Sequence, residues 1–358
     1  MKKLLLLFLL AFLAVPIASA EESVVTLTTT LDEGASIKLY TWADSMDDAF
    51  TIDWGDGVEK IYNKVKPSWT YGSEITGKLG ASKTITIKGD ITYLEIREMQ
   101  ISAATFANTK LKEVDMEKNQ LTDFNLSGLP EVTKLSLNGN SIVTFSSTGN
   151  SVLKNLGLKS NKIDSHQFEI SSLANSLEQL NVSGNGENFV ALNLINFDKL
   201  EYFTANDNPE LTTVVFYDGS TNLKQISMNN CHIMHFYAIS LPNLNTLNLS
   251  NNALLDFENG TYPKLSTLSV NGNYLSEIDV TKFPKLFSFD CSSNQLTDIN
   301  VANNPELNYF NCGNNKLTSV DVSTNKELGR CWSTATHCRA STSPIMNRWA
   351  QSTSAIRR

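Results

Sequence analysis

The sequence predicts a mainly β protein built as a solenoid of about eleven rungs, with a small β module in front of it. Three observations predict this architecture. An asparagine recurs at near-constant intervals over most of the 358-residue chain, each time after an alternating apolar run. The residues before this repeat form short β-branched runs separated by turn residues. Beyond Ala20, the chain contains no apolar stretch long enough to span a membrane.

Residues 1–20 have the pattern of a secretory signal peptide. Lys2 and Lys3 precede an apolar run, which ends in the small residues Ala18–Ala20. A membrane-spanning helix is the alternative, but the run is short and is interrupted by Pro16. We therefore expect cleavage after Ala20 and export of the remaining chain.

The charge distribution argues against two classes of partner. Residues 329–358 hold five arginines and no acidic residue. Without these arginines and the two lysines of the leader, residues 21–328 hold 22 basic against 37 acidic residues. A body this acidic repels phosphate backbones and anionic membrane surfaces. We therefore expect no nucleic-acid partner and no membrane insertion.

Residues 21–90 are expected to form the N-terminal β module. Its strand-like runs are SVVTLTTTL, SIKLYTWA, AFTIDW, VEKIYNKV and KTITIKG. The sequence DWGDG at residues 53–57 separates two of these runs. Asp53 and Asp56 are candidate calcium ligands, but two carboxylates are few for calcium. A hairpin turn that uses Asp and Gly for their backbone dihedrals is the favoured interpretation.

Residues 91–328 carry eleven rungs close to the pattern L-x-x-L-x-L-x-x-N-x-L. Met99 holds the asparagine position of the first rung. In the later rungs this position is held by Asn119, Asn140, Asn161, Asn185, Asn208, Cys231, Asn252, Asn273, Asn294 and Asn315. One strand per rung, always in the same direction, builds a parallel sheet, and stacking buries leucines that no single rung can bury. Because an amide side chain both donates and accepts, we expect the asparagines to satisfy buried backbone groups at the turn.

Two cysteines fall on inward strand positions of adjacent rungs. Cys291 and Cys312 are one repeat apart, so parallel pairing places them roughly 5 Å from one another. Free thiols that pack as small apolar residues are the favoured interpretation. A disulfide is the alternative, although side chains that point the same way from parallel neighbours seldom reach its geometry.

The remaining candidate sites for chemistry are weak. In the segment CHIMH, Cys231, His232 and His235 have a spacing that suggests a metal site. The repeat, however, directs the cysteine inward and places both histidines in the following loop. The chain has four histidines and no hydrolase motif beside them, and its Gly-rich turns lack a phosphate-binding lysine. We expect no catalysis, no metal and no cofactor.

The repeat resembles the leucine-rich repeat superfamily. A short rung with cysteine in a strand position, followed by LTDINV (296–301) or LTSVDV (317–322), is similar to the internalin-like repeats of bacterial surface proteins. The N-terminal segment resembles small β-sandwich modules of bacterial surface proteins that carry a DWGDG turn, and we expect it to cap the first rung. The resemblance implies a curved solenoid that is displayed outside the cell, binds macromolecules and performs no chemistry.

The polar positions between the inward leucines are expected to face the concave side, where relatives in this superfamily bind. The predicted ligand-binding residues are Tyr202, Thr204, Asn206, Gln225, Asn229, Asn248, Asn271, Asp290, Tyr309 and Asn311. Amides, hydroxyls and aromatic rings suit a glycan or an extended polar polypeptide, including ligands of host origin. A solvated face that only keeps the solenoid soluble is the alternative.

The favoured function is therefore that of an exported bacterial recognition or adhesion protein, secreted or displayed on the cell surface. We expect it to act as a monomer, to bind a protein or a glycan, and to be non-catalytic. An inert stalk or spacer within a larger surface protein is the alternative function.

Residues 329–358 lack the repeat and are expected to be irregular and disordered. A second coding frame, in which each codon's last base is joined to the first two of the next, permits a sequence that continues the repeat. In that frame His337–Cys338 forces a leucine and Trp349–Ala350 forces a glycine, each one repeat after Leu317 and Gly329 respectively. We therefore hypothesise that a frameshift near residue 329 replaced further repeats with out-of-frame residues.

Overall fold

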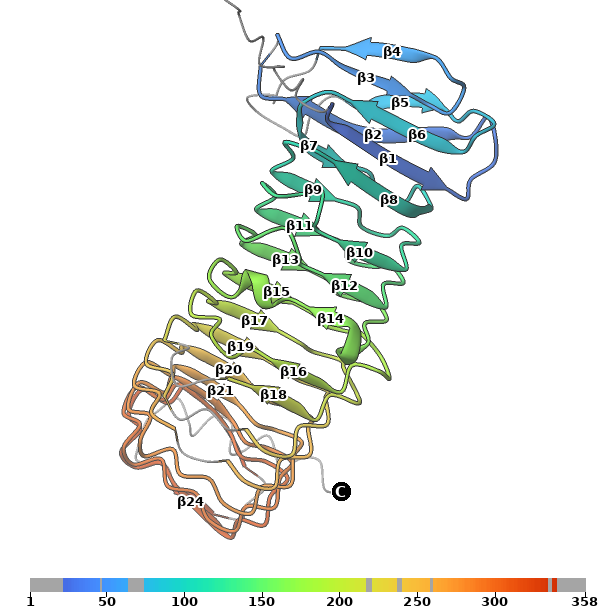
Figure 1. The fold of residues 1–358 in the computed structure, drawn as a ribbon. Helices are drawn as coiled ribbons and strands as arrows, with labels where there is room; N and C mark the ends of the chain where they lie inside the picture. The colour runs from blue at the N-terminus through green and yellow to red at the C-terminus, as the bar shows by residue number, and fades with distance from the viewer. Residues whose placement is uncertain are drawn as a thin grey trace, which may run out of the picture.

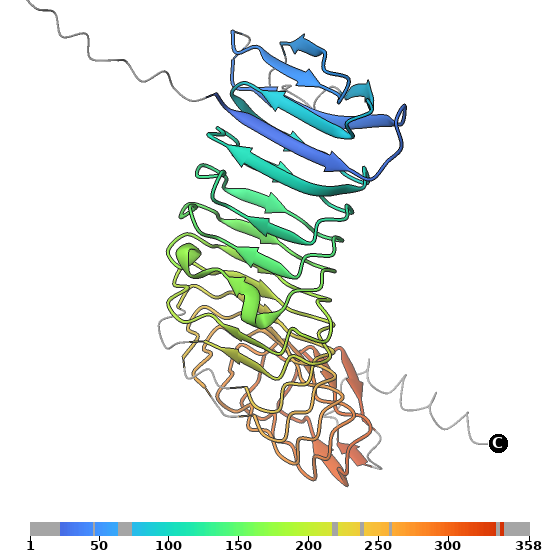
Figure 2. The ribbon, with the colours of Figure 1, turned by 45° about the vertical axis from the view of Figure 1, so that its right-hand side comes forward.

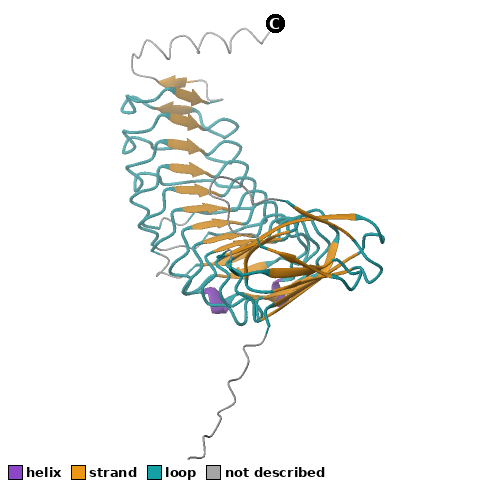
Figure 3. Ribbon diagram, turned by 90° about the horizontal axis from the view of Figure 1, so that it is seen from above, coloured by secondary structure: helices purple, strands orange, loops and turns teal. Residues whose placement is uncertain are grey.

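The computed structural model shows a long β-solenoid with a β module at its N-terminal end (Figure 1). The described residues are 22–45, 47–63, 74–216, 221–236, 240–257, 260–333 and 337–339. Their regular secondary structure consists of strands and of two short 3₁₀-helices, which Figure 3 shows in purple. The mainly β solenoid that the sequence predicts is confirmed. The predicted leader and residues 340–358 lie outside the described residues.

The long sheet contains one parallel strand from each predicted rung (Figures 1 and 2). Its strands are β7 Ile91–Glu95, β9 Glu113–Asp115, β11 Lys134–Ser136, β13 Asn155–Gly157, β15 Gln179–Asn181, β17 Tyr202–Thr204, β19 Gln225–Ser227, β20 Thr246–Asn248, β21 Thr267–Ser269, β22 Ser288–Asp290 and β23 Tyr309–Asn311. The middle residue of each of these three-residue strands is apolar and buried, as the alternation predicts. Leu247 lies opposite Leu268, and Leu268 opposite Phe289, so the register advances by one complete repeat per rung.

A second set of short parallel strands, which was not expected from the sequence, runs along another side of the coil in three small sheets (Figure 1). They are β10 Asp123–Asn125, β12 Thr144–Ser146, β14 Phe168–Glu169, β16 Ala191–Asn193, β18 Thr213–Val215, β24 Ser319–Asp321 and β26 His337–Arg339. Phe124 and Phe145, the middle residues of β10 and β12, are buried. These rungs therefore close their coil with a second apolar contact.

The longest rung accommodates its extra residues in 3₁₀ turns. The interval from Asn161 to Asn185 exceeds that of every other rung, and it contains η1 Ser165–Gln167 and η2 Ser171–Leu173. Asp164 caps η1, because its side chain accepts from the backbone N–H of His166 at 2.8 Å. The long sheet stays in register across this rung, where Leu156 lies opposite Leu180.

The repeat asparagines bond backbone groups of their own rung and of the preceding one. Asn273 Nδ2 donates to the carbonyls of Leu249 and Val270, both at 2.9 Å. Its Oδ1 accepts from the N–H of Leu254 at 3.0 Å. Contacts of the same kind occur at Asn119, Asn140, Asn161, Asn185, Asn208, Asn252, Asn294 and Asn315.

The residue before each repeat asparagine, and before Cys231, adopts the left-handed backbone conformation. These residues are Lys118, Gly139, Ser160, Gly184, Asp207, Asn230, Asn251, Gly272, Ser293 and Asn314. At Gly272 φ is 67° and at Asn251 it is 54°. Because most side chains disfavour this conformation, the position is rich in glycine and asparagine. The turn that admits the asparagine side chain into the core is therefore also encoded in the sequence.

A second asparagine column near the C-terminal end was not anticipated. Asn304 Nδ2 donates to the carbonyls of Val280 at 2.9 Å and Phe283 at 2.8 Å. Asn325, one repeat later, donates to Val301 at 2.9 Å and to Asn304 at 2.8 Å. These asparagines open the similar segments NPEL (304–307) and NKEL (325–328), but two members are too few to reveal a period.

The N-terminal module contains strands in all five predicted runs. They are β1 Val24–Thr29, β2 Ser36–Ala43, β3 Phe50–Asp53, β4 Glu59–Tyr62 and β6 Thr84–Lys88. Two further strands, β5 Ile75–Lys78 and β8 Ile101–Ala107, were not expected. One sheet has the order β4-β3-β6-β1-β8, while β2 pairs with β5 and with β7 of the solenoid. Strand β8 lies beyond residue 90, so the division at this position and the capping role stay predictions.

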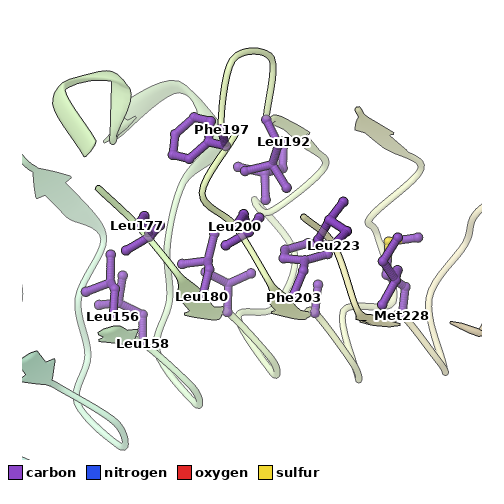
Figure 4. Packing of buried hydrophobic residues seen from close by; sticks show 14 of the residues in the cluster. Leu156, Leu158, Leu177, Leu180, Leu192, Phe197, Leu200, Phe203, Leu223 and Met228 are labelled. Atoms are coloured by element: carbon purple, nitrogen blue, oxygen red, sulfur yellow. The ribbon is translucent and has the colours of Figure 1, made fainter. Parts of the chain in front are cut away.

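The core continues from the module through the solenoid without a break. One cluster of buried apolar residues extends from Val25 to Leu328. Figure 4 shows the middle of this cluster, where Leu156, Leu180 and Phe203 of successive strands point into the coil. Farther along, the Phe289 and Phe310 rings stack with their centroids 5.6 Å apart. Apolar side chains of neighbouring rungs thus pack against one another along the whole cluster.

Two short strands correct the expectation that residues 329–358 are irregular throughout. Strand β25 Arg330–Trp332 pairs with β23, and β26 pairs with β24, both in parallel. These ladders are made by backbone groups, so residues outside the leucine pattern can extend them. Disorder and a frameshift stay hypotheses for the remaining tail.

Candidate functional site

An open cavity of about 390 Å³ lies at the edge of the long sheet, where the chain enters strands β17, β19 and β20. We call it the Tyr202 cavity. It is lined by Tyr202, Lys224, Gln225, Asn243, Asn245, Thr246 and Lys264. Of these residues, Tyr202 and Gln225 belong to the predicted site.

The sheet register positions the row of side chains at the base of this cavity. Tyr202, Gln225 and Thr246 are the first residues of their strands and lie opposite one another. Their following neighbours, Phe203 among them, are buried, so the first side chains must point outward. Parallel pairing spaces the row at about 4.8 Å per rung. The aromatic ring of Tyr202, the amide of Gln225 and the hydroxyl of Thr246 therefore lie in one row.

Two lysines occupy the rim of the cavity in different electrostatic settings. Lys224 Nζ lies 2.7 Å from Glu201 Oε2 and 5.8 Å from the centroid of the Tyr202 ring. The hydrogen bond to Glu201 raises the pKa of Lys224, so its ammonium remains charged at neutral pH. Lys264 Nζ instead donates to Asn243 Oδ1 at 2.6 Å, and it forms no ion pair with a described residue. One positive charge in the cavity is therefore not neutralised by any acid among the described residues.

Amide groups complete the lining. Asn243 Nδ2 donates to the carbonyl of Thr221 at 2.7 Å, which turns its Oδ1 toward Lys264. Asn245 Oδ1 accepts from Thr246 Oγ1 at 3.2 Å. Gln225 is exposed, and its amide makes no hydrogen bond to other described residues. The Gln225 amide is therefore available to a ligand both as donor and as acceptor.

Most of the other predicted site residues already form hydrogen bonds along the face. Asn206 Oδ1 accepts from the N–H of Asn229 at 3.0 Å, and Asn311 Nδ2 donates to Asp290 Oδ2 at 3.1 Å. Ser250 donates from its side-chain hydroxyl to Asn271 Oδ1 and from its backbone N–H to Asn248 Oδ1. Thr204 and Tyr309 are half-buried, and Tyr309 lies against Trp332 with ring centroids 5.1 Å apart. The structure does not gather these eight residues into the cavity.

Sequence reasoning missed Lys224, Asn243, Asn245 and Lys264 because they precede the strands. The alternation identifies outward positions within a strand and carries no information about the loop that leads into it. The signal was a run of amides and lysines at equivalent positions of successive rungs. Such a pattern acquires meaning only when the rungs are stacked.

The acidic end of the face is a closed network. Arg97 pairs with Asp115 and lies 3.5 Å from Glu95 Oε1. Glu117 Oε1 accepts from Ser136 Oγ at 2.5 Å and from the adjacent Asn138. These partners already use the charges and hydrogen-bonding groups that a ligand would need. We therefore regard this end of the face as structural.

The weak metal candidates have local roles. Asp53 Oδ1 accepts from the backbone N–H groups of Gly55 at 2.8 Å and Gly57 at 3.0 Å, as in a tight turn. Cys231 Sγ donates to the carbonyl of Ala205 at 3.1 Å, and His235 Nδ1 lies 3.1 Å from Asp256. Among the described residues, no three His, Cys, Asp or Glu side chains are grouped to hold a metal.

The cysteines are expected to differ in their reaction with iodoacetamide. The thiols of Cys291 and Cys312 are buried and should stay unmodified until the protein unfolds. Cys231, which the repeat directs inward and which would therefore be a core residue, is only half-buried, and burial raises its pKa to about 11. Because the thiolate reacts, its modification should be slow at pH 8 and accelerate about tenfold per pH unit below its pKa. Peptide mass spectrometry measures each site, and an internal disulfide or equal rates would contradict the expectation.

Solved structures share the geometry of this solenoid. The functional domain of InlJ from Listeria monocytogenes, whose description includes a cysteine ladder, is 22% identical, with a TM-score of 0.57. The fold is a leucine-rich repeat solenoid. The match covers 71% of this chain and 56% of that structure, so the chain spans little more than half of its length.

Other leucine-rich repeat structures are more distant. An internalin of Listeria monocytogenes is 20% identical over 73% of this chain and 84% of its own, with a TM-score of 0.44. A leucine-rich repeat protein of Leptospira interrogans is 19% identical over 65% and 69% of the two chains, with a TM-score of 0.46. Neither a protein-family model nor a curated protein sequence matches the chain.

Within the described part of this solenoid, no helix has the length and apolar character that crossing a bilayer requires.

Proposed function

We propose that this chain is an exported, non-catalytic recognition protein that binds a protein or a glycan on the outward face of its long sheet. The Tyr202 cavity is the observation that carries the proposal. It combines a 38% exposed aromatic ring with two ammonium groups and several amide groups. Concave sites with few convergent polar groups are typical of ligand binding.

The composition of the cavity favours binding over catalysis. The described residues that line it include no carboxylate, imidazole or thiol. These groups supply most general acid–base and nucleophilic chemistry at neutral pH, and the hydrogen bond to Glu201 raises the pKa of Lys224 rather than lowering it, as an activated amine would need. Amides, hydroxyls and ammonium groups instead recognise a ligand through hydrogen bonds and charge.

The proposed location is the bacterial cell surface or the extracellular space, with the solenoid acting as a monomer. The leader sequence and the acidic body support export into a compartment without nucleic acid. A glycan or protein of host origin is among the ligands that such a protein meets.

Binding is expected to depend on Tyr202. The purified chain from residue 21 onward is screened against immobilised glycans and extracellular proteins, and each ligand found is titrated by calorimetry. Replacing Tyr202 with alanine should weaken binding by roughly 10- to 100-fold, because aromatic side chains commonly dominate binding surfaces. Tyr274→Ala is the matched control, since Tyr274 is 55% exposed but lies in the loop after Asn273 rather than on a strand.

The outcomes separate recognition from an inert spacer. Absence of any ligand for a folded chain favours the spacer. A ligand whose affinity is equal for the wild type and Tyr202→Ala contradicts a site at this cavity. Equal losses in Tyr202→Ala and Tyr274→Ala indicate nonspecific adhesion through aromatic rings.

A further inference from the structure

We propose that the Tyr202 cavity selects a carboxylate-bearing sugar residue of an acidic glycan. This inference rests on the proposed function and adds the chemical class of the ligand. It follows from a charge that lacks a counter-ion among the described residues, from an amide held in a fixed orientation, and from a described lining in which Tyr202 is the one side chain that is not an amide, a hydroxyl or a lysine.

The unneutralised charge belongs to Lys264. At the equivalent position one repeat later, Lys285 Nζ lies 2.5 Å from Glu306 Oε1. Lys264 has the neutral oxygen of Asn243 as its hydrogen-bond partner instead. Both lysines are exposed, yet only Lys264 lines the cavity. The acidic body repels long polyanions, but salt screens that repulsion beyond about 10 Å, so a single carboxylate that enters the cavity meets this ammonium, with Lys224 on the same rim.

The ammonium of Lys264 is held in place before any ligand arrives. The hydrogen bond from Asn243 Nδ2 to Thr221 fixes the amide, and its oxygen in turn holds Lys264 Nζ. A lysine that is already ordered loses less conformational entropy when it binds a carboxylate. Charge-assisted hydrogen bonds of this kind are about twice as strong as neutral ones.

The rest of the lining suits hydroxyl groups. Gln225 and Asn245 present amide groups and Thr246 presents a hydroxyl, all within the same cavity. Sugar hydroxyls both donate and accept, and amides match them in both roles. Tyr202 offers a flat apolar ring beside these groups, against which the C–H face of a sugar can pack.

An acidic peptide fits the cavity less well. Peptide recognition relies on apolar or aromatic anchors that fill dry pockets. Here the apolar side chains of the strands, Phe203, Ile226 and Leu247, point into the core. Tyr202 is the one aromatic residue among the described residues that line the cavity. One exposed ring with many polar groups favours a saccharide over a polypeptide.

The test compares charged and uncharged forms of the same sugar. The chain from residue 21 onward is titrated by calorimetry with an oligogalacturonide, a hyaluronan oligosaccharide and sialyllactose, and with the methyl ester of each. At least one acid should bind roughly 10-fold or more tightly than its ester. Lys264→Gln should remove this preference, at a loss of roughly 10- to 100-fold in affinity for the acid. Lys285→Gln, which removes one charge from the neighbouring rung, is the matched control and should bind like the wild type.

Several results would overturn the inference. They are equal affinity for every acid and its ester, equal losses in Lys264→Gln and Lys285→Gln, or tighter binding of an aspartate-rich peptide than of any sugar. A neutral glycan or a protein that binds in a Tyr202-dependent manner would leave the proposed function standing and remove only the acidic class. Circular dichroism of both lysine variants establishes that any loss is not a loss of folding.

Discussion

Replacing Phe289 with alanine is expected to lower the free energy of unfolding by about 3–5 kcal/mol. Phe289 is the middle residue of β22, is fully buried and stacks on Phe310 of the next rung. Truncation removes this contact and leaves a cavity between two rungs. The backbone ladders of β21, β22 and β23 hold the rungs at a fixed spacing, so the cavity cannot close easily.

A matched control lies two residues earlier in the chain. Phe287 has the same side chain and lies in the same segment, but it is 49% exposed. Phe287→Ala should change stability by less than about 0.5–1 kcal/mol. Urea denaturation followed by circular dichroism compares the two variants with the wild type. Similar midpoints for both variants would show that β22 does not bury Phe289 against the core.

Replacing Asn273 with alanine is expected to destabilise the protein by about 2–4 kcal/mol. The substitution leaves the carbonyls of Leu249 and Val270 and the N–H of Leu254 without their buried partner. Such groups lose their hydrogen bonds to water on folding and gain none in return, which is the costly case. The effect should reach the preceding rung, because Leu249 and Leu254 both belong to it.

Thr267→Ala is the control for Asn273→Ala, because Thr267 is an outward residue of β21 and is half-buried. Native-state hydrogen exchange adds a local readout. The amide of Leu254 should lose protection in Asn273→Ala and keep it in Thr267→Ala. Equal denaturation midpoints together with unchanged protection at Leu254 would contradict the role of the asparagine column.

The solenoid could be predicted because its physical requirement recurs in every rung. A buried turn needs a side chain that both donates and accepts, so asparagine returns at a constant spacing at Asn252, Asn273 and Asn294. The strand alternation around Leu247 and Leu268 then determines direction and register. The same turn recurs in every rung, which explains why the residues before the asparagines repeatedly adopt the left-handed backbone conformation. This feature was not predicted.

Features without a repeated requirement could not be predicted. Strand β8 joins the N-terminal sheet through pairing with β1, which depends on residues far apart in the chain. Asn304 and Asn325 form a column of only two members, too few to stand out as a period. The cavity depends on loop residues such as Lys264, whose neighbours become visible only after the rungs are stacked.

The register of the last regular rungs has a consequence for how such a molecule changes during evolution. Thr246, Thr267 and Ser288 lie opposite one another at a constant interval, and Asn252, Asn273 and Asn294 repeat the same bonds. Recombination that removes or duplicates the codons of one whole repeat between these rungs returns every surviving residue to an equivalent neighbour. A gain or loss of one residue within a strand would instead turn polar side chains into the core. The length of the solenoid can therefore change by whole rungs, each of which adds or removes about 5 Å. The stability contributed by each remaining rung stays the same.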